Sequence, residues 1–494
     1  MFSSPLLDGG GIIFLFIYLF SLIGIGLLGH FAKKENSLGD FYLARRCMGG
    51  FVLFLTLYAT QYSGNTMIGF SGRAYRQGFT SLVTISFMCA IIGLYFIYAP
   101  KLHNLSKKYN FITLGDFIYH RFKSFHLTLI ISLISIIALG NYILTNLKAI
   151  GSIVEGATGG QVSFVNAIII LSIIMVVYET LGGMRSVAWT DMLQGILLLF
   201  GVLIIFFIIN FQYGGINVIS SKLQELRPDF WSPPSWSEKR LWLSTILIVS
   251  IGVSVYPHAI QRIYSAKSSS TLRKSLQIMV FMPFVTTFFM VIVGMVGASQ
   301  IEGLNRIDSE QISILLLLDL AEKIPAISWL LVLFLSATIA AIMSTVDSAL
   351  LAISSMVTQD IYGKTKQNLS QNHLLLFGKL TSWVVMFIAV VMAIKLPQTI
   401  WQLFQIKLEL LCQIAPAIFF GIHFKSLSSK SILIGVYIGT VISLGFMGGN
   451  WLGMPIPVKP LGIHAGLWGL IINLLIVFSM NNKLFINKKN NYSL

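Results

Sequence analysis

The chain has 494 residues, of which 55% are hydrophobic and only 11% are charged, whereas a soluble domain is about 25% charged. This composition excludes water as the main solvent. The formal net charge of +16 does not indicate nucleic-acid binding, because the basic residues lie in short loops and form no stripe with interleaved aromatic residues. No nucleotide-binding loop, metal-ligand cluster or nucleophile motif is present, so we predict neither an enzyme nor an organic cofactor.

Apolar runs long enough to span a membrane recur from one end of the chain to the other. The first, from Gly10 to Leu28, follows an acidic leader and lacks a small-x-small cleavage site, so we expect a retained span rather than a signal peptide. Because the runs are continuously apolar rather than alternating, they predict helices and not a closed barrel. We expect an all-α membrane protein with about thirteen transmembrane helices, centred on Leu19, Tyr58, Ser86, Ser135, Leu171, Gly201, Ile248, Val291, Ala341, Phe387, Leu411, Ile438 and Ile472.

The distribution of basic residues predicts the orientation. With the N-terminus outside, most of the 34 Lys and Arg residues fall in loops on the cytoplasmic side, as the positive-inside rule requires. We therefore expect a multi-pass protein of the plasma or inner membrane with a cytoplasmic C-terminus. The loops assigned to the cytoplasm surround Lys33, Lys107, Arg185, Arg273, Lys364, Lys430 and Lys488.

The second predicted span is interrupted by polar residues and glycines. The segment from Leu57 to Phe70 reads LYATQYSGNTMIGF, and hydrocarbon penalises such groups unless they are buried in protein or line a cavity. Transporters use breaks of this kind to offer freed carbonyls to ions. Close helix packing through small polar residues is the alternative interpretation.

The ninth predicted span contains a second polar cluster. It runs from Ser336 to Ser348 as SATIAAIMSTVDS, and its hydroxyls and carboxylate form a hard-oxygen surface of the kind that sodium prefers. Ser and Thr can also bond back to their own helix. Two such clusters in one chain favour an ion site.

Several segments together resemble the sodium:solute symporter family, especially its bacterial pantothenate-like and proline-like branches. The resemblance extends from about Gly39 to Gly439 and rests on the order of the motifs along the chain. The motifs are GDFYLARR from Gly39, YNFITLGDF from Tyr109 with Arg121-Phe122, GGMRSVAWTDMLQ from Gly182, Pro257-His258 with Arg262, and AAIMSTVDS from Ala340.

The resemblance implies a single transporter domain with a LeuT-like core. The core would be two inverted five-helix repeats, spans two to six and seven to eleven, at about residues 48–422. The first helix, at 10–30, and two further helices, at about 431–480, would be additions, followed by a cytoplasmic tail at 481–494.

The resemblance also implies a sodium site between the second and ninth spans, with Na⁺ as the coupling ion. Its expected ligands are the carbonyls of Ala59, Tyr62 and Ala341 and the hydroxyls of Ser344 and Thr345. In the family an aspartate at the position of Asp191 lies on the cytoplasmic ion route; an N-cap role at the start of the sixth span is the alternative.

The residues expected to contact the solute depart from the proline branch. That branch has an acidic residue at Gln61 and aromatic residues at Val249 and Val253, so proline is not expected as the solute. The two valines suit an apolar part of a ligand. Ser63 and Asn65 at the break and Tyr142 on the fourth span are further candidates.

Other ionisable residues within or near the spans have open assignments. Lys407 and Glu409 are two positions apart on a helix, so we expect them to have different partners. Glu179 is expected to pair with Arg185. For His258 we expect a structural role in a loop, although a proton relay is conceivable.

The predicted function is sodium-coupled uptake of a small polar organic solute by alternating access. A proton-coupled or uncoupled permease of the same fold is one alternative. A transporter-like membrane sensor of a solute is another, although family members of that kind carry cytoplasmic signalling domains after the spans.

Overall fold

The computed structural model describes residues 9–306, 308–324, 327–366, 369–396, 400–451 and 457–481. Within these ranges the protein is helical, with a single isolated β-bridge between Met48 and Ala266. The predicted all-α fold is therefore confirmed. The expected tail at 481–494 lies outside the described residues, except for Asn481.

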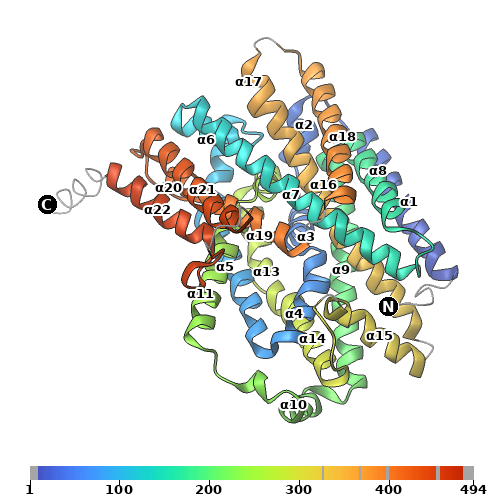
Figure 1. Cartoon of the computed structure of the whole chain (residues 1–494). Helices are drawn as coiled ribbons and strands as arrows, with labels where there is room; N and C mark the ends of the chain where they lie inside the picture. The colour runs from blue at the N-terminus through green and yellow to red at the C-terminus, as the bar shows by residue number, and fades with distance from the viewer. Residues whose placement is uncertain are drawn as a thin grey trace.

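Long apolar helices form most of the molecule (Figure 1). Only structures that satisfy every backbone polar group internally are stable in hydrocarbon, which is why uninterrupted apolar sequence folds as helix. The helices of 19 residues or more are α1 (Gly9–Phe31), α5 (Val83–Tyr109), α7 (Phe125–Ala157), α8 (Phe164–Gly182), α9 (Met184–Gln212), α11 (Trp236–Ser254), α16 (Ser328–Met356), α18 (Gln371–Lys395) and α21 (Ser429–Trp451).

Within the described residues, ten helices are long and apolar enough to cross a membrane, or eleven if a bent pair counts as one span. This count is below the thirteen expected because two apolar helices are shorter than a full span, α3 (Gly50–Gln61) and α22 (Ala465–Met480). All thirteen expected centres nevertheless lie in helices. Four further helices of the bundle are α13 (Ser269–Met279), α14 (Phe288–Gln300), α19 (Ile400–Leu411) and α20 (Ala415–His423).

The first span of each expected repeat is interrupted. After α3 the chain leaves the helix and resumes as a π-helical turn, η2 (Asn65–Gly69), followed by α4 (Phe70–Gln77). In the first span of the second expected repeat, α11 and α12 (Pro257–Ser265) are bent by 48° relative to each other. π-Helical turns and breaks of this kind are frequent at functional sites.

Helix α16 lies at the centre of the bundle and packs against α7, α9 and α3. Helix α16 is part of a longer continuous helix, Ser328–Thr365, and 83% of the residues in an 18-residue apolar stretch of that helix are buried. The corresponding fraction for α1 is 22%. The small residues of α16 permit this close packing. Helix α1 packs on α8 and α9, and α21 and α22 pack mainly on each other.

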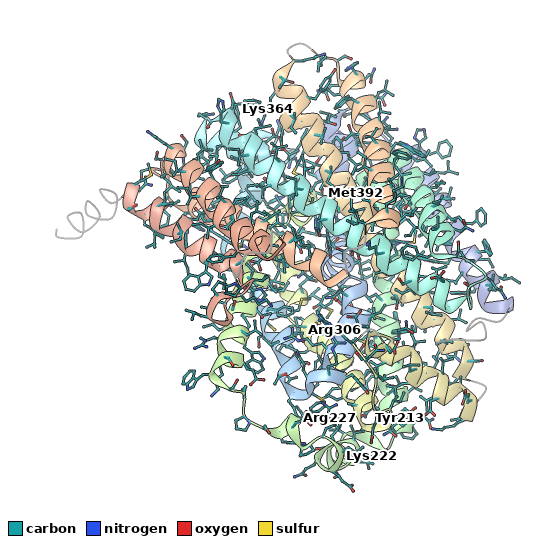
Figure 2. The ribbon with its side chains drawn as sticks, viewed as in Figure 1. Tyr213, Lys222, Arg227, Arg306, Lys364 and Met392 are labelled. Carbon is teal, nitrogen blue, oxygen red and sulfur yellow. The ribbon has the colours of Figure 1, made fainter. Side chains whose placement is uncertain are left out.

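Short helices connect the spans at the two ends of the molecule. One end carries α2 (Leu38–Leu43), α6 (Leu114–Phe122) and α17 (Gly363–Thr365), and the opposite end carries α10 (Gly215–Leu226) and α15 (Ile312–Lys323) (Figure 1). In Figure 2, Lys364 marks the first end, and Lys222 and Arg227 mark the second.

Candidate functional site

The end of α3 supplies backbone carbonyls at the first break. The last carbonyls of a helix have no intrahelical partner, and the chain becomes extended at Tyr62, with φ −105° and ψ 104°. The Ala59 carbonyl, in the last turn of α3, accepts a hydrogen bond from the Ser344 hydroxyl of α16 at 3.1 Å. This contact joins the broken span directly to the central helix.

Helix α16 brings three more oxygens to the same place. The Ser344 hydroxyl lies 3.0 Å from the Ala341 carbonyl, and the Thr345 hydroxyl donates to that carbonyl at 2.9 Å. Two carbonyls and two hydroxyls from two helices therefore meet, and all four residues are buried. Such oxygens are the ligands that a hard cation prefers, so four of the five expected ligand residues fit sodium.

Tyr62, the fifth expected ligand residue, lies at the break itself. Its side chain is fully buried, and its ring packs against Tyr58 with centroids 4.8 Å apart. Its amide donates to the Tyr58 carbonyl at 3.0 Å. Ligation by the Tyr62 carbonyl stays a prediction.

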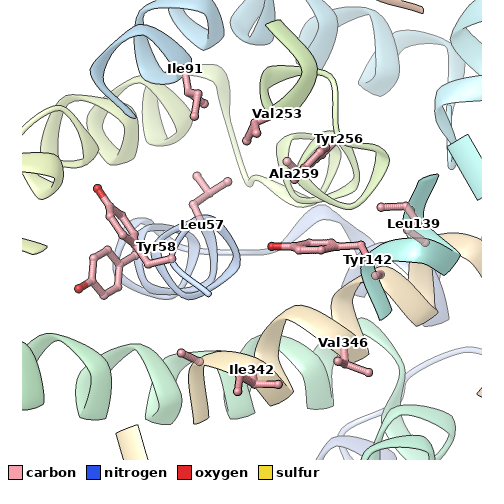
Figure 3. Close-up of a cluster of buried hydrophobic side chains, with 14 of the residues drawn as sticks. Leu57, Tyr58, Ile91, Leu139, Tyr142, Val253, Tyr256, Ala259, Ile342 and Val346 are labelled. Atoms are coloured by element: carbon pink, nitrogen blue, oxygen red, sulfur yellow. The ribbon is translucent and has the colours of Figure 1, made fainter. Parts of the chain in front are cut away.

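Tyr142 connects the break to its surroundings. Its side chain lies between α3, the junction of α11 with α12, and α16 (Figure 3), and it interacts with the side chains of Ser63 and Thr345. The structure therefore brings two of the candidate solute residues, Tyr142 and Ser63, to one of the candidate sodium ligands.

The other candidate solute residues divide into two groups. Val249 and Val253 lie one turn apart near the end of α11, and both are buried; Val253 lies in the same apolar cluster as Tyr142 (Figure 3). The amide of Gln61 instead lies 4.0 Å from Met88 of α5. The side chain of Asn65 packs on Gly69 of its own turn.

The second interruption, between Ser254 and Pro257, escaped the sequence analysis. Our placement of His258 in a loop was wrong, because it lies in α12 and is fully buried. Its ring packs against Tyr256 and Tyr142, with centroid distances of 4.8 and 5.9 Å. A proline at the start of a helix, directly after an apolar run, is the sequence signal that could have revealed this junction.

Asp191 forms a buried ion pair with Arg262 of α12, at 2.7 Å. The N-cap alternative was wrong, because α9 begins at Met184 after Gly183 and Asp191 lies inside it. Thr56 of α3 donates to the Asp191 carboxylate and accepts from Arg262 Nε at 2.8 Å. Asp191 is thus tied to both interrupted spans.

The same network reaches the candidate sodium ligands. Arg262 donates to the Ser348 hydroxyl, and that hydroxyl donates to the Ser344 carbonyl at 2.5 Å. Next to it, the Tyr178 hydroxyl of α8 donates to Asp347 at 2.6 Å. A continuous set of buried polar contacts therefore runs from the ligand turn of α16 to Asp191.

The remaining ionisable residues have structural partners. Glu409 contacts the His464 ring at 3.2 Å and accepts from the Gly466 amide, whereas the Lys407 ammonium lies 3.2 Å from the centre of the Tyr142 ring. The expectation of different partners for Lys407 and Glu409 is therefore confirmed. The expected pairing of Glu179 with Arg185 was wrong, since Ser382 donates to Glu179 at 3.2 Å and Arg185 pairs with Asp40.

Comparison with known proteins identifies the class. The model of the sodium:solute symporter family matches residues 41–439, which is most of the chain, and the protein belongs to this family. It is a sodium-coupled solute symporter and not an enzyme.

The individual relatives are distant. A sodium/pantothenate symporter of Haemophilus influenzae is 27% identical over 368 residues, covering 74% of each chain. Sodium/proline symporter 2 of Staphylococcus saprophyticus is 25% identical over 467 residues, covering 93% of this chain and 88% of that protein. A solved Na⁺-coupled sialic acid symporter superposes with a TM-score of 0.79 at 20% identity, covering 94% of this chain and 96% of that one. This likeness supports the expected LeuT-like fold.

Proposed function

We propose that sodium binds where the break after α3 meets α16, and that its inward flow drives uptake of a small organic solute. The observation that carries this proposal is the contact between the Ser344 hydroxyl and the Ala59 carbonyl, because an ion held there joins the broken span to the central helix. The site is neutral apart from the cation, and the carbonyl end of α3 carries partial negative charge. One sodium ion contributes about 2.3 kcal/mol per 100 mV of membrane potential.

The solute binds beside the ion, between the two interrupted spans. Ser63 and Tyr142 offer hydroxyls there, and Val253 offers apolar surface near Tyr142 (Figure 3). Because Tyr142 also contacts Thr345, a solute that moves Tyr142 also changes the sodium ligands. This shared contact supports coupling of the two binding events.

Asp191 and Arg262 close the cytoplasmic side of the site. Their ion pair connects α9 with α12 and, through Thr56, with α3, so the inner ends of both interrupted spans are held together. Opening this network would release sodium and solute inward. In alternating access, these contacts then break on the cytoplasmic side while the route from the site to the outside closes.

The protein lies in a plasma or inner membrane, with its N-terminus outside and its C-terminus in the cytoplasm. Lys364, in a loop assigned to the cytoplasm, and Arg227, in a loop assigned to the outside, lie at opposite ends of the molecule (Figure 2). The excess of Lys and Arg on the Lys364 side supports this direction. Cysteine labelling of Ser232→Cys and Ser428→Cys in intact cells tests it, with only the former accessible to an impermeant reagent.

Uptake into proteoliposomes tests the function. We expect a sodium gradient to drive accumulation of at least one solute from a panel of monocarboxylates, pantothenate, proline, other amino acids and sugars. Accumulation driven by a proton gradient without sodium would favour the proton-coupled alternative. Binding without any flux would favour a sensor.

A further inference from the structure

An apolar groove runs between four helices, α5, α11, α20 and α22, which lie together on one side of the molecule (Figure 1). Its volume of about 630 Å³ is typical of a ligand-binding pocket. The groove opens to the surroundings of the bundle, since Ile97 in its lining is 55% exposed. At membrane depth those surroundings are lipid chains, which are as apolar as leucine. The lining includes Leu94, Ile97, Ile251, Phe420, Leu470 and Leu474.

One end of this groove has a basic rim, formed by His423, Lys101 and Lys425. His423, the last residue of α20, lines the groove itself. Lys101 follows Ile97 by four positions on α5 and therefore lies on the same face, one helical turn further along. Lys425 comes two residues after His423, and both lysines are exposed. The groove is thus apolar along its length and basic at one end.

Arg121 of α6 shows at which end of the molecule the basic rim lies. Its Nε donates to the Gly421 carbonyl at 2.8 Å, and its guanidinium also donates to the Phe424 carbonyl, so the last turn of α20 is held against α6. This is the end that Lys364 marks in Figure 2, and the proposed orientation places it in the cytoplasm. Anionic headgroups of the cytoplasmic leaflet attract lysine and arginine side chains near the membrane surface.

The chain segments that form the groove and its rim contain no acidic residue. The sequence has no Asp or Glu between Asp40 and Asp116, a stretch that includes all of α5, and none after Glu409, a stretch that includes α20 and α22. Asp116, in the first turn of α6, already pairs with Lys364 at 3.6 Å. The rim therefore carries a net positive charge that is complementary to a phosphate, and charge-assisted hydrogen bonds to phosphate are among the strong ones.

We infer that the groove is a binding site for an anionic phospholipid, with an acyl chain between the four helices and the phosphate against the basic rim. The apolar lining alone would accept any lipid chain. The rim adds selectivity, because a zwitterionic headgroup brings its own cation towards Lys101 and Lys425, whereas an anionic one does not. The bound lipid also touches an interrupted span, since Ile251 of α11 lies in the lining, two positions before Val253.

Matched lipids test the inference on the purified full-length protein in a neutral detergent. The probes are phosphatidylglycerol and phosphatidylcholine with the same oleoyl chains, and glycerol 3-phosphate as a headgroup without chains. The readout is thermal stabilisation as a function of the added probe, since a ligand that binds only the folded protein raises its melting temperature. We expect phosphatidylglycerol to stabilise the protein at lower concentration than phosphatidylcholine, and glycerol 3-phosphate to have no effect.

Variants of the rim and of the groove separate the two parts of the site. Lys101→Gln/Lys425→Gln should weaken the apparent affinity for phosphatidylglycerol at least about fivefold and leave that for phosphatidylcholine unchanged. Leu474→Trp, which fills the groove, should weaken both. Lys222→Gln/Lys239→Gln, on α10 and in the first turn of α11, is the matched control and should change neither.

Three results would overturn the inference. The first is an equal response of the wild type to the two lipids, which would describe an unselective apolar surface. The second is a response to phosphatidylglycerol that is unchanged in Lys101→Gln/Lys425→Gln or is lost equally in the control pair. The third is stabilisation by glycerol 3-phosphate alone, which would indicate a site for free phosphate compounds. Because both rim lysines are exposed, their variants should melt at the wild-type temperature without added lipid.

Discussion

Arg262 and Asp191 form an ion pair in which both side chains are fully buried and which joins α12 to α9. Removing one member of such a pair leaves an uncompensated charge in a medium of low dielectric constant. Thr56 and Ser348, which bind the same guanidinium, cannot supply the missing charge.

Asp191→Asn and Arg262→Met should each destabilise the protein by about 3–5 kcal/mol. The double variant Asp191→Asn/Arg262→Met should lose less than the sum of the two, since it leaves no isolated charge. Thermal unfolding of the detergent-purified variants measures this. Strictly additive losses would show that the two charges do not stabilise each other.

Gly64 lets the first break approach the central helix. A Cβ atom at this position would lie 2.3 Å from Cγ1 of Ile342 on α16. Gly64→Ala should therefore destabilise the protein by about 1–3 kcal/mol through overpacking and weaken sodium binding by moving α3 away from Ser344. Ile342→Ala, combined with Gly64→Ala, should recover part of both losses.

Gly140→Ala on α7 is the matched control for this substitution, because its added Cβ would meet nothing within 4 Å. It should leave thermal unfolding and sodium binding unchanged. If Gly64→Ala behaves like Gly140→Ala, then close packing at the break does not support the ion site.

The pair of Asp40 and Arg185 predicts a loss of stability in acid. Burial acts to raise the pKa of Asp40, but hydrogen bonds from Arg185 and from the Glu35 and Lys34 amides outweigh it and hold that pKa below its usual value. A carboxyl with a lowered pKa in the folded state stabilises it above the unfolded pKa of about 3.9. This stabilisation disappears as the pH falls through the folded value.

Asp40→Asn should lower the melting temperature at pH 7 and flatten its dependence on pH below about 4. The measurement is thermal unfolding of wild type and variant in buffers from pH 7 to pH 3. An identical acid response in both proteins would contradict a role for this carboxyl.

The sequence predicted those structural features that follow directly from the type of residue. Continuous apolar runs can only be helices in a membrane, and the polar insertion from Thr60 to Asn65 in such a run predicts a break. The hydroxyls of Ser344 and Thr345 both reach the Ala341 carbonyl, three and four positions earlier on the same helix, and contacts at this spacing can be predicted from the sequence.

Long-range partners could not be predicted in this way. Arg262 lies 71 positions from Asp191, and only the fold decides that it reaches Asp191. For the same reason, Arg185 pairs with Asp40 and not with Glu179, although Glu179 is only six positions from Arg185 in the sequence. The junction at Tyr256 was missed because it contains neither glycine nor an extended polar run, and its only signal is Pro257.

Direct binding of ²²Na⁺ to the purified protein tests the central claim. Ser344→Ala removes a proposed ligand, whereas Ser336→Ala on the same helix removes a buried hydroxyl that bonds back to the Val332 carbonyl at 2.7 Å. We predict sodium affinity equal to wild type for Ser336→Ala and at least about tenfold weaker for Ser344→Ala, as expected for the loss of a ligand to a charged group. Equal sodium affinity in Ser344→Ala and wild type would contradict an ion site between α3 and α16.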